Sequence, residues 1–165
     1  MIAQLRNTLQ LLSDAKVEFI LVGGLSAVVR GAPVHTYDVD VVHNRDPRNV
    51  DRILRVLESL EAVFRIQPQR RLRPNQSHLT GKGHINLITI NGPFDLLCTI
   101  GKDLTYEDLL PHSDELILQE GLKVRVLRLE KLIELKEELN DEKDRAMLPL
   151  LRRTLAEIRK SESAR

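Results

Sequence analysis

The stretch Val22-Gly23-Gly24-Leu25-Ser26, followed by Thr36-Tyr37-Asp38-Val39-Asp40-Val41, decides the fold of this chain. The apolar run 17–22 ends at the two glycines, which is typical of a buried strand that enters a tight turn. Residues 25–30 then read as a helix, and residues 37–42 predict a second strand. A strand, a glycine turn and an acidic strand therefore follow one another within 30 residues.

The second strand carries two carboxylates on one face. Asp38 and Asp40 stand two residues apart, so their side chains project together while Val39 and Val41 project to the opposite side. Adjacent carboxylates repel each other unless a positive charge lies between them. Hard oxygen ligands in this arrangement suit Mg²⁺ or Mn²⁺. The alternative is a solvated face of an edge strand.

A third acid lies far downstream, in Phe94-Asp95-Leu96. Asp95 is an isolated acid in an otherwise apolar predicted strand, and burying such a group is costly unless it is compensated. A metal site shared with Asp38 and Asp40 would compensate it, with two ions about 3.5–4 Å apart. Otherwise Asp95 is a turn residue that follows Asn91-Gly92-Pro93.

The glycine turn has a functional and a structural interpretation. Glycine adopts positive φ and lets a ligand approach the backbone, and a helix start offers free N–H groups to an anion. Gly23, Gly24 and the hydroxyl of Ser26 are therefore candidate phosphate-binding groups. A Gly-Gly pair is, however, more often a simple tight turn, and the pattern matches neither a P-loop nor a Rossmann fingerprint.

Taken together, these residues resemble the nucleotidyltransferase superfamily with the DNA polymerase β-like fold. Its pattern is a hydrophobic-Gly-Gly/Ser turn, a gap of about nine to thirteen residues, Asp-hydrophobic-Asp/Glu, and a later third carboxylate. Thirteen residues separate Gly24 from Asp38 here. The match covers residues 1–110, and the chain looks most like small prokaryotic members, including relatives of abortive-infection toxins from toxin–antitoxin pairs.

The resemblance implies a reaction and a set of roles. The chain would transfer NMP from an NTP to a hydroxyl acceptor, which is RNA, a protein or a small molecule, and release pyrophosphate. Asp38, Asp40 and Asp95 would bind Mg²⁺ or Mn²⁺, and Asp95 would assist deprotonation of the acceptor. Gly23, Gly24 and Ser26 would hold nucleotide phosphates. Tyr37 departs from the pattern, because relatives often carry a basic residue there.

Two charged residues near the C-terminus face the predicted core. Lys136 falls on the apolar stripe that Leu129 begins, and Asp144 begins the inward-facing series that continues with Leu148. Charges that face a core are seldom free-standing. Lys136 and Asp144 therefore either pair with each other or line a polar cavity. The resemblance favours the second, with both residues at the nucleotide site and Lys136 contributing to catalysis.

The remaining patterns predict one α/β or α+β domain with a mixed sheet flanked by helices. We expect a single domain over 1–165, with a core at 1–110 and a C-terminal hairpin and helices at 113–160. The expected helices are 2–14, one from Asp46 to Leu60, 105–110, 129–139 and 143–160. The further strands are 84–90, 94–100, 113–118 and 122–126, and Asn91-Gly92 is a strong hairpin signal. Residues 65–83 look irregular.

Composition limits the location and the partners. The net charge is +1, from 25 basic and 24 acidic residues, so any site for a polyanion must be local. A single cysteine, Cys98, fits a reducing compartment, and neither a signal peptide nor a membrane span is visible. We expect a cytoplasmic protein without membrane association, with a homo-oligomer or an antitoxin as the further partner to consider.

Alternatives remain open at this stage. Arg65, Arg70, Arg71 and Arg73 form a basic stretch that is a solvated loop or, less favoured, a phosphate-binding patch. The protein as a whole is a catalytically inactive nucleotidyltransferase-like binding protein in one alternative. In another it is an interaction protein that pairs through its terminal helices.

Overall fold

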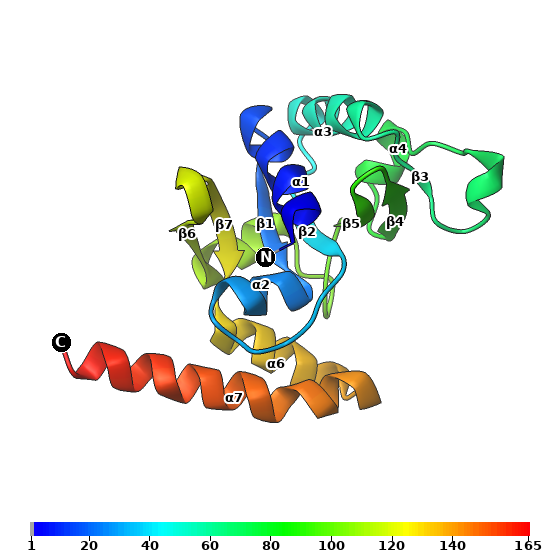
Figure 1. Cartoon of the computed structure of the whole chain (residues 1–165). Helices are drawn as coiled ribbons and strands as arrows, with labels where there is room; N and C mark the ends of the chain where they lie inside the picture. The colour runs from blue at the N-terminus through cyan, green and yellow to red at the C-terminus, as the bar shows by residue number, and fades with distance from the viewer. Residues whose placement is uncertain (1) are drawn as a thin grey trace.

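The computed structural model describes residues 2–165, built on one seven-stranded mixed sheet (Figure 1). Its strands are β1 (Phe19–Val22), β2 (Val39–His43), β3 (Val63–Phe64), β4 (His84–Thr89), β5 (Gly92–Leu97), β6 (Ser113–Ile117) and β7 (Lys123–Leu127). The spatial order is β3-β4-β5-β2-β1-β7-β6. β2 lies at the centre, antiparallel to β1 and parallel to β5, so the predicted mixed sheet is confirmed.

Helices cover both faces of this sheet. They are α1 (Ala3–Asp14), α2 (Gly23–Val29), α3 (Pro47–Ser59), α4 (Gln76–Leu79), α5 (Tyr106–Leu109), α6 (Leu129–Leu139) and α7 (Glu142–Ser163). Short 3₁₀ turns lie at Pro68–Arg70, Leu110–His112 and Gln119–Gly121. Figure 1 shows α1 and α3 on one side of the sheet and α6 and α7 on the other. No helix within residues 2–165 has both the length and the apolar character to cross a membrane.

Strand alternation divides the core into two apolar clusters. Val39, Val41, Phe94 and Leu96 are buried in the cluster that α1 and α3 cover. The opposite face carries a second cluster, which includes Val42 and residues of α6 and α7. Because side chains alternate along a strand, Asp40 and Asp95 must lie on this second face. The carboxylates therefore face the C-terminal helices.

Most predicted elements are confirmed, with shifted ends. The hairpin at Asn91-Gly92 joins β4 to β5, and Thr89 pairs with Gly92. α6 begins and ends where its apolar pattern predicts, and α7 continues through Pro149 as one helix. Residues 65–83 hold more structure than expected, because β3 and two short helical turns lie in or beside them. Two-residue strands and single turns are too short to produce a periodic pattern.

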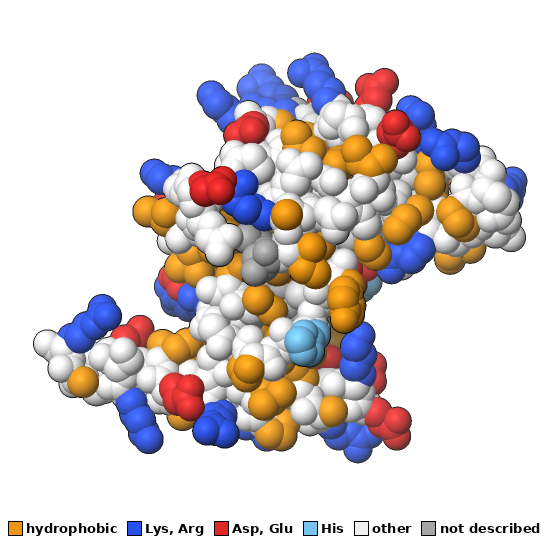
Figure 2. All heavy atoms as spheres, viewed as in Figure 1, with side chains coloured by type: hydrophobic (Ala, Val, Ile, Leu, Met, Phe, Trp, Pro, Cys, Tyr) orange, Lys and Arg blue, Asp and Glu red, His pale blue; other side chains and the backbone are white. Residues whose placement is uncertain are grey.

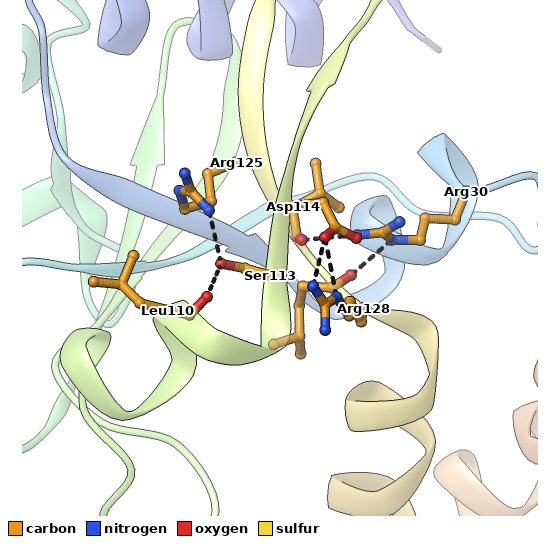
Figure 3. Close-up of polar contacts among 8 residues, drawn as sticks. Arg30, Leu110, Ser113, Asp114, Arg125 and Arg128 are labelled. Carbon is orange, nitrogen blue, oxygen red and sulfur yellow. Dashed lines mark hydrogen bonds and ion pairs between the residues drawn. The ribbon is translucent and has the colours of Figure 1, made fainter.

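Arg30, at the end of α2, ties this helix to the β6–β7 hairpin (Figure 3). Its guanidinium donates to the carbonyl oxygens of Val126 and Leu127, each at 2.9 Å, and to Asp114 at 3.1 Å. Arg128 donates two further hydrogen bonds to Asp114. Hydrogen bonds from Arg128 and Arg30 hold the pKa of Asp114 below its usual value. This clamp orients α2, and therefore the glycine turn at its start.

We expect Arg30→Ala to lower the free energy of unfolding by about 2–3 kcal/mol, because two backbone carbonyls lose their donor. Arg128→Ala serves as the matched control: its side chain is half exposed, and its loss should cost about 1 kcal/mol or less. Urea denaturation of both variants measures the difference. Equal losses would show that the two carbonyl contacts of Arg30 contribute nothing.

Candidate functional site

The register between β2 and β5 brings the three predicted acids together. Asp40 stands directly opposite Asp95 in the parallel pair, and Asp38 immediately precedes β2. One carboxylate oxygen from each of the three residues lies within 4.8 Å of the other two. Thr36 Oγ1 donates to Asp38 Oδ1 at 3.0 Å and so orients the first carboxylate.

Gly23 makes room for this cluster. Its φ of +65° is a backbone conformation that residues with a side chain rarely adopt. A Cβ atom at this position would also collide with Asp40 Oδ2. Gly24 lies in turn against the side chain of Thr36, where an added Cβ would be 3.1 Å away. The glycine pair is therefore required by the close approach of the acidic strand as well as by the turn.

Ser26 is the one predicted site residue whose side chain is not brought to the cluster. It is buried, and its hydroxyl donates to the carbonyl oxygen of Gly23 at 2.6 Å. Its position in the first turn of α2 explains the contact, because a hydroxyl there reaches back to the preceding turn. Ser26 braces the glycine turn from behind, in place of the direct phosphate or metal contact that the sequence suggested.

Burial and mutual repulsion perturb the carboxylates. Burial, followed by repulsion from Asp38 and Asp95, raises the pKa of Asp40 to about 7. Burial also raises the pKa of Asp95, and the positive charge of Arg65 opposes that rise. A cluster with these properties binds either a proton or a cation.

Arg65 belongs to this site, although the sequence placed it in a solvated loop. It follows β3 at the edge of the sheet, and its guanidinium pairs with Asp95 Oδ1 and donates to the carbonyl of Leu87. The other three arginines of the basic stretch, Arg70, Arg71 and Arg73, are exposed as predicted. An unpaired acid in β5 was the available signal that a cation had to lie nearby.

A cavity of about 320 Å³ opens in front of the carboxylates. Gly23, Gly24, Asp38 and Asp40 line its sheet side, and Arg65 lies at its edge. The α6–α7 side contributes three charged residues and one methionine, which are Lys136, Lys143, Asp144 and Met147. The sheet and the C-terminal helices thus form the two walls of one cavity.

Lys136 and Asp144 both pair with each other and line the cavity, the two alternatives that their inward position suggested. Lys136 Nζ lies 2.6 Å from Asp144 Oδ1, and the two largely buried side chains form an ion pair. The same pair forms part of the cavity wall opposite Asp40. Lys143, in the first turn of α7, is exposed and borders the cavity as well.

A second cavity of about 530 Å³ lies beside the first on the same face of the sheet. The two share Gly23, Asp40, Lys136 and Asp144. Leucines of α6, among them the 63% exposed Leu139, form its apolar side. Asp40 therefore stands between two spaces that could receive two reactants.

The donor set fits a divalent cation. All three candidate ligands are carboxylate oxygens, the type that Mg²⁺ and Mn²⁺ prefer. Their separation suits a shared ion. Burial, and then repulsion from Asp38 and Asp95, raises the pKa of Asp40, and a bound cation would favour its charged form. Arg65 and Lys136 offset part of the negative charge of the three carboxylates.

Gly23→Ala tests the close approach of Asp40. We expect the unfolding free energy to fall by about 2 kcal/mol or more, and the Mn²⁺-induced rise in Tm to disappear, because Asp40 is displaced. Gly121→Ala is the control: it has a similar φ of +75°, but nothing lies within 4 Å of the added Cβ. It should cost about 1 kcal/mol and keep the Mn²⁺ response. A Mn²⁺ response retained by Gly23→Ala would contradict this account.

Asp40 should give the metal-free protein a distinctive pH dependence. Its pKa rises from 3.8 to about 7 on folding, so between these values the folded state binds the proton that the unfolded state has lost. Stability should therefore fall as the pH rises from about 4 to 7. Asp40→Asn removes this contribution, and it should be the more stable protein at pH 8 in EDTA. The prediction would be contradicted if the unfolding free energy of the two proteins changed by the same amount between pH 5 and pH 8.

Comparison with known proteins establishes the fold. Neither a family model nor a curated protein matches this chain. A protein of Thermotoga maritima that is provisionally named a nucleotidyltransferase has a similar structure, with 18% identity, a TM-score of 0.54, and coverage of 98% of this chain and 91% of the other. The antibiotic-resistance factor ANT(2″)-Ia, in its solution structure, gives 12% identity, a TM-score of 0.59, and coverage of 98% and 92%.

These identities are too low to transfer a substrate or a residue's role. The likeness nevertheless extends over almost the whole length of the chains compared. The closer resemblance to abortive-infection toxins stays a prediction. The architecture predicted from the glycine turn and the three acids is confirmed: this chain has a nucleotidyltransferase-like fold.

Proposed function

We propose that this protein is a metal-dependent nucleotidyltransferase that transfers NMP from an NTP to a hydroxyl acceptor. One observation carries the proposal. Three carboxylates have oxygens within 4.8 Å of one another, and two of them, Asp38 and Asp40, line a cavity beside the glycine turn whose far wall carries lysines. We take residues 1–165 to act as one catalytic domain, because both walls of the cavity are needed.

Asp38, Asp40 and Asp95 would hold Mg²⁺ or Mn²⁺. The bound cations would neutralise phosphate charge and favour ionisation of the acceptor hydroxyl. Arg65 occupies Oδ1 of Asp95, which leaves Oδ2 as the oxygen for a ligand or a proton. Thr36 keeps Asp38 oriented, and Gly23 keeps Asp40 at the turn.

The NTP would enter with its phosphates between the glycine turn and the C-terminal helices. Lys136 and Lys143 supply positive charge on the helix side of the cavity, and the backbone of Gly23 and Gly24 lies open on the sheet side. Ser26 contributes indirectly by fixing the carbonyl of Gly23. Asp144 orients Lys136 through their ion pair. Preorganised charge of this kind stabilises the transition state of phosphoryl transfer.

The reaction needs no covalent enzyme intermediate. The acceptor oxygen forms a bond to the α-phosphorus as the bond from that phosphorus to the bridging oxygen of the β-phosphate breaks. Pyrophosphate carries away the electron pair of the broken bond. The hydroxyl proton passes to Asp95 Oδ2 and from there to solvent. Two adjacent cavities would allow the NTP and the acceptor to approach Asp40 from different sides.

Incubation with each labelled NTP, Mg²⁺ or Mn²⁺, and nucleic-acid, protein and small-molecule acceptors tests this function. We expect metal-dependent NMP transfer with release of pyrophosphate, abolished in the double variant Asp38→Ala/Asp40→Ala. Transfer that survives in the double variant would overturn the proposed site. NTP binding that requires no metal in the wild type would argue equally against the role of the carboxylates.

Lys136→Gln separates charge from packing at the nucleotide site. The amide keeps a donor for Asp144, while the loss of the charge should lower kcat/KM by about tenfold to a hundredfold. Lys123→Gln, an exposed lysine of β7 that borders neither cavity, is the control and should leave kcat/KM unchanged. Steady-state pyrophosphate release measures both. Equal rates for the two variants would exclude Lys136 from the nucleotide site.

A further inference from the structure

Positive charge is segregated within this nearly neutral chain. Residues 62–94 hold five Lys and Arg and no acid, which leaves 20 basic and 24 acidic residues for the rest of the chain. The uncompensated charge belongs to the segment from β3 to the start of β5, at one edge of the sheet. A nearly neutral chain needs a local basic surface of this kind to bind a polyanion.

The basic surface culminates in a projecting arm, residues 65–73. Figure 1 and Figure 2 show the connection from β3 to α4 extending away from the body of the molecule. Every residue from 66 to 73 is exposed, and the backbone N–H of Phe64 bonds the carbonyl of Leu72 to close the arm at its base. The ion pair of Arg71 with Glu61 is long, at 4.0 Å, and both partners are largely exposed. The arginines of the arm are therefore available to a ligand.

The base of this arm reaches the carboxylates. Arg65, its first residue, pairs with Asp95 and borders the cavity that contains Asp38 and Asp40. Its Nε is buried and has no hydrogen-bond partner in the described part of the chain. The hydrogen-bonding capacity of this guanidinium is therefore only partly used by the protein. Beyond it, Lys82 and His84 border the second cavity. The arginines of the arm and Lys82 thus place positive charge from the exposed arm to the rim of the site.

We propose that the acceptor is a single-stranded polynucleotide with a free terminal hydroxyl, whose phosphates lie along the arm. This inference rests on the proposed function and names its acceptor. Four of the five cations in 62–94 are arginines, whose planar guanidinium matches phosphate oxygens in a two-pronged contact. A strand bound along the arm ends at Arg65, which places its terminal hydroxyl beside Asp95.

The composition of the arm also indicates how the strand is recognised. The arm contains no aromatic residue on which bases could stack. Its exposed polar residues, such as Gln67 and Gln69, offer hydrogen bonds to sugars and phosphates. Binding should therefore depend on the phosphate backbone and on salt, with little preference for base sequence. An acidic protein surface is the competing acceptor, and it lacks the regular phosphate spacing.

Fluorescence anisotropy tests the arm without NTP or metal, in EDTA. The probes are fluorescein-labelled single-stranded RNA and DNA of about 12 nucleotides. The test variant is Arg70→Gln/Arg71→Gln, in which each glutamine keeps a side-chain stem at its backbone position. We expect affinity at low salt to fall about tenfold, and the slope of log K against log salt to lose about 1.4, or ~0.7 per phosphate contact. The two probes distinguish RNA from DNA as the source of the phosphates.

The matched control is Arg48→Gln/Arg55→Gln, which removes two exposed charges from α3, away from the cavities. It should bind both probes within about twofold of the wild type. Equal weakening of the two variants would overturn the proposal, since net charge and not the arm would then account for binding. A wild-type protein that binds neither probe would also overturn it.

The transfer assay distinguishes this proposal from the proposed function. NMP transferred to a polynucleotide by the wild type, and much less by the arm variant, supports the assignment. Transfer to an acidic protein alone, or to a polynucleotide equally well by both, overturns it while the nucleotidyltransferase function stands. If no NTP binds but polynucleotide binding still depends on the arm, the function fails and the arm remains a nucleic-acid surface.

Discussion

Repulsion among three carboxylates on one face of β2 and β5 is the constraint on which the rest of the structure around the site depends. The parallel register sets Asp40 opposite Asp95, and apolar packing on the far face of the sheet holds both strands in place. Burial of Asp40, together with repulsion from Asp38 and Asp95, raises its pKa to about 7. Cations must offset the remaining negative charge, and the chain supplies them from two distant segments, one that follows β3 and one in α6.

Those cations come from two separate parts of the fold. Arg65 reaches Asp95 from the edge strand, across β4, and Lys136 faces Asp40 from the helical wall on the other side of the cavity. Each is itself held, Arg65 by the carbonyl of Leu87 and Lys136 by Asp144. The positive groups are thus fixed before any ligand arrives, which is the condition for electrostatic preorganisation. A triphosphate would find this arrangement already formed.

Much of the site could be predicted from sequence because its parts are local. A strand that alternates Asp38, Val39 and Asp40 fixes which side chains share a face, and helical spacing turns Lys136 inward. Arg65 could not be predicted in the same way. It stands in an irregular stretch after a two-residue strand, and its partner lies 30 residues away on a strand two places removed in the sheet. For Ser26 the local pattern misled: its place after the glycine turn suggested a phosphate contact, but its hydroxyl donates to the carbonyl oxygen of Gly23.

The sequence by itself determined the glycine turn, the acidic strand, the Asn91-Gly92 hairpin and the inward face of the C-terminal helices. Each of these depends on residues close together in the chain, where backbone preference and side-chain alternation decide the outcome. Only the tertiary structure decided that three acids share one site, that Lys136 and Asp144 complete its far wall, and that Arg65 neutralises Asp95. The physical reason is that these contacts depend on strand order and on packing between distant segments, which no local pattern records.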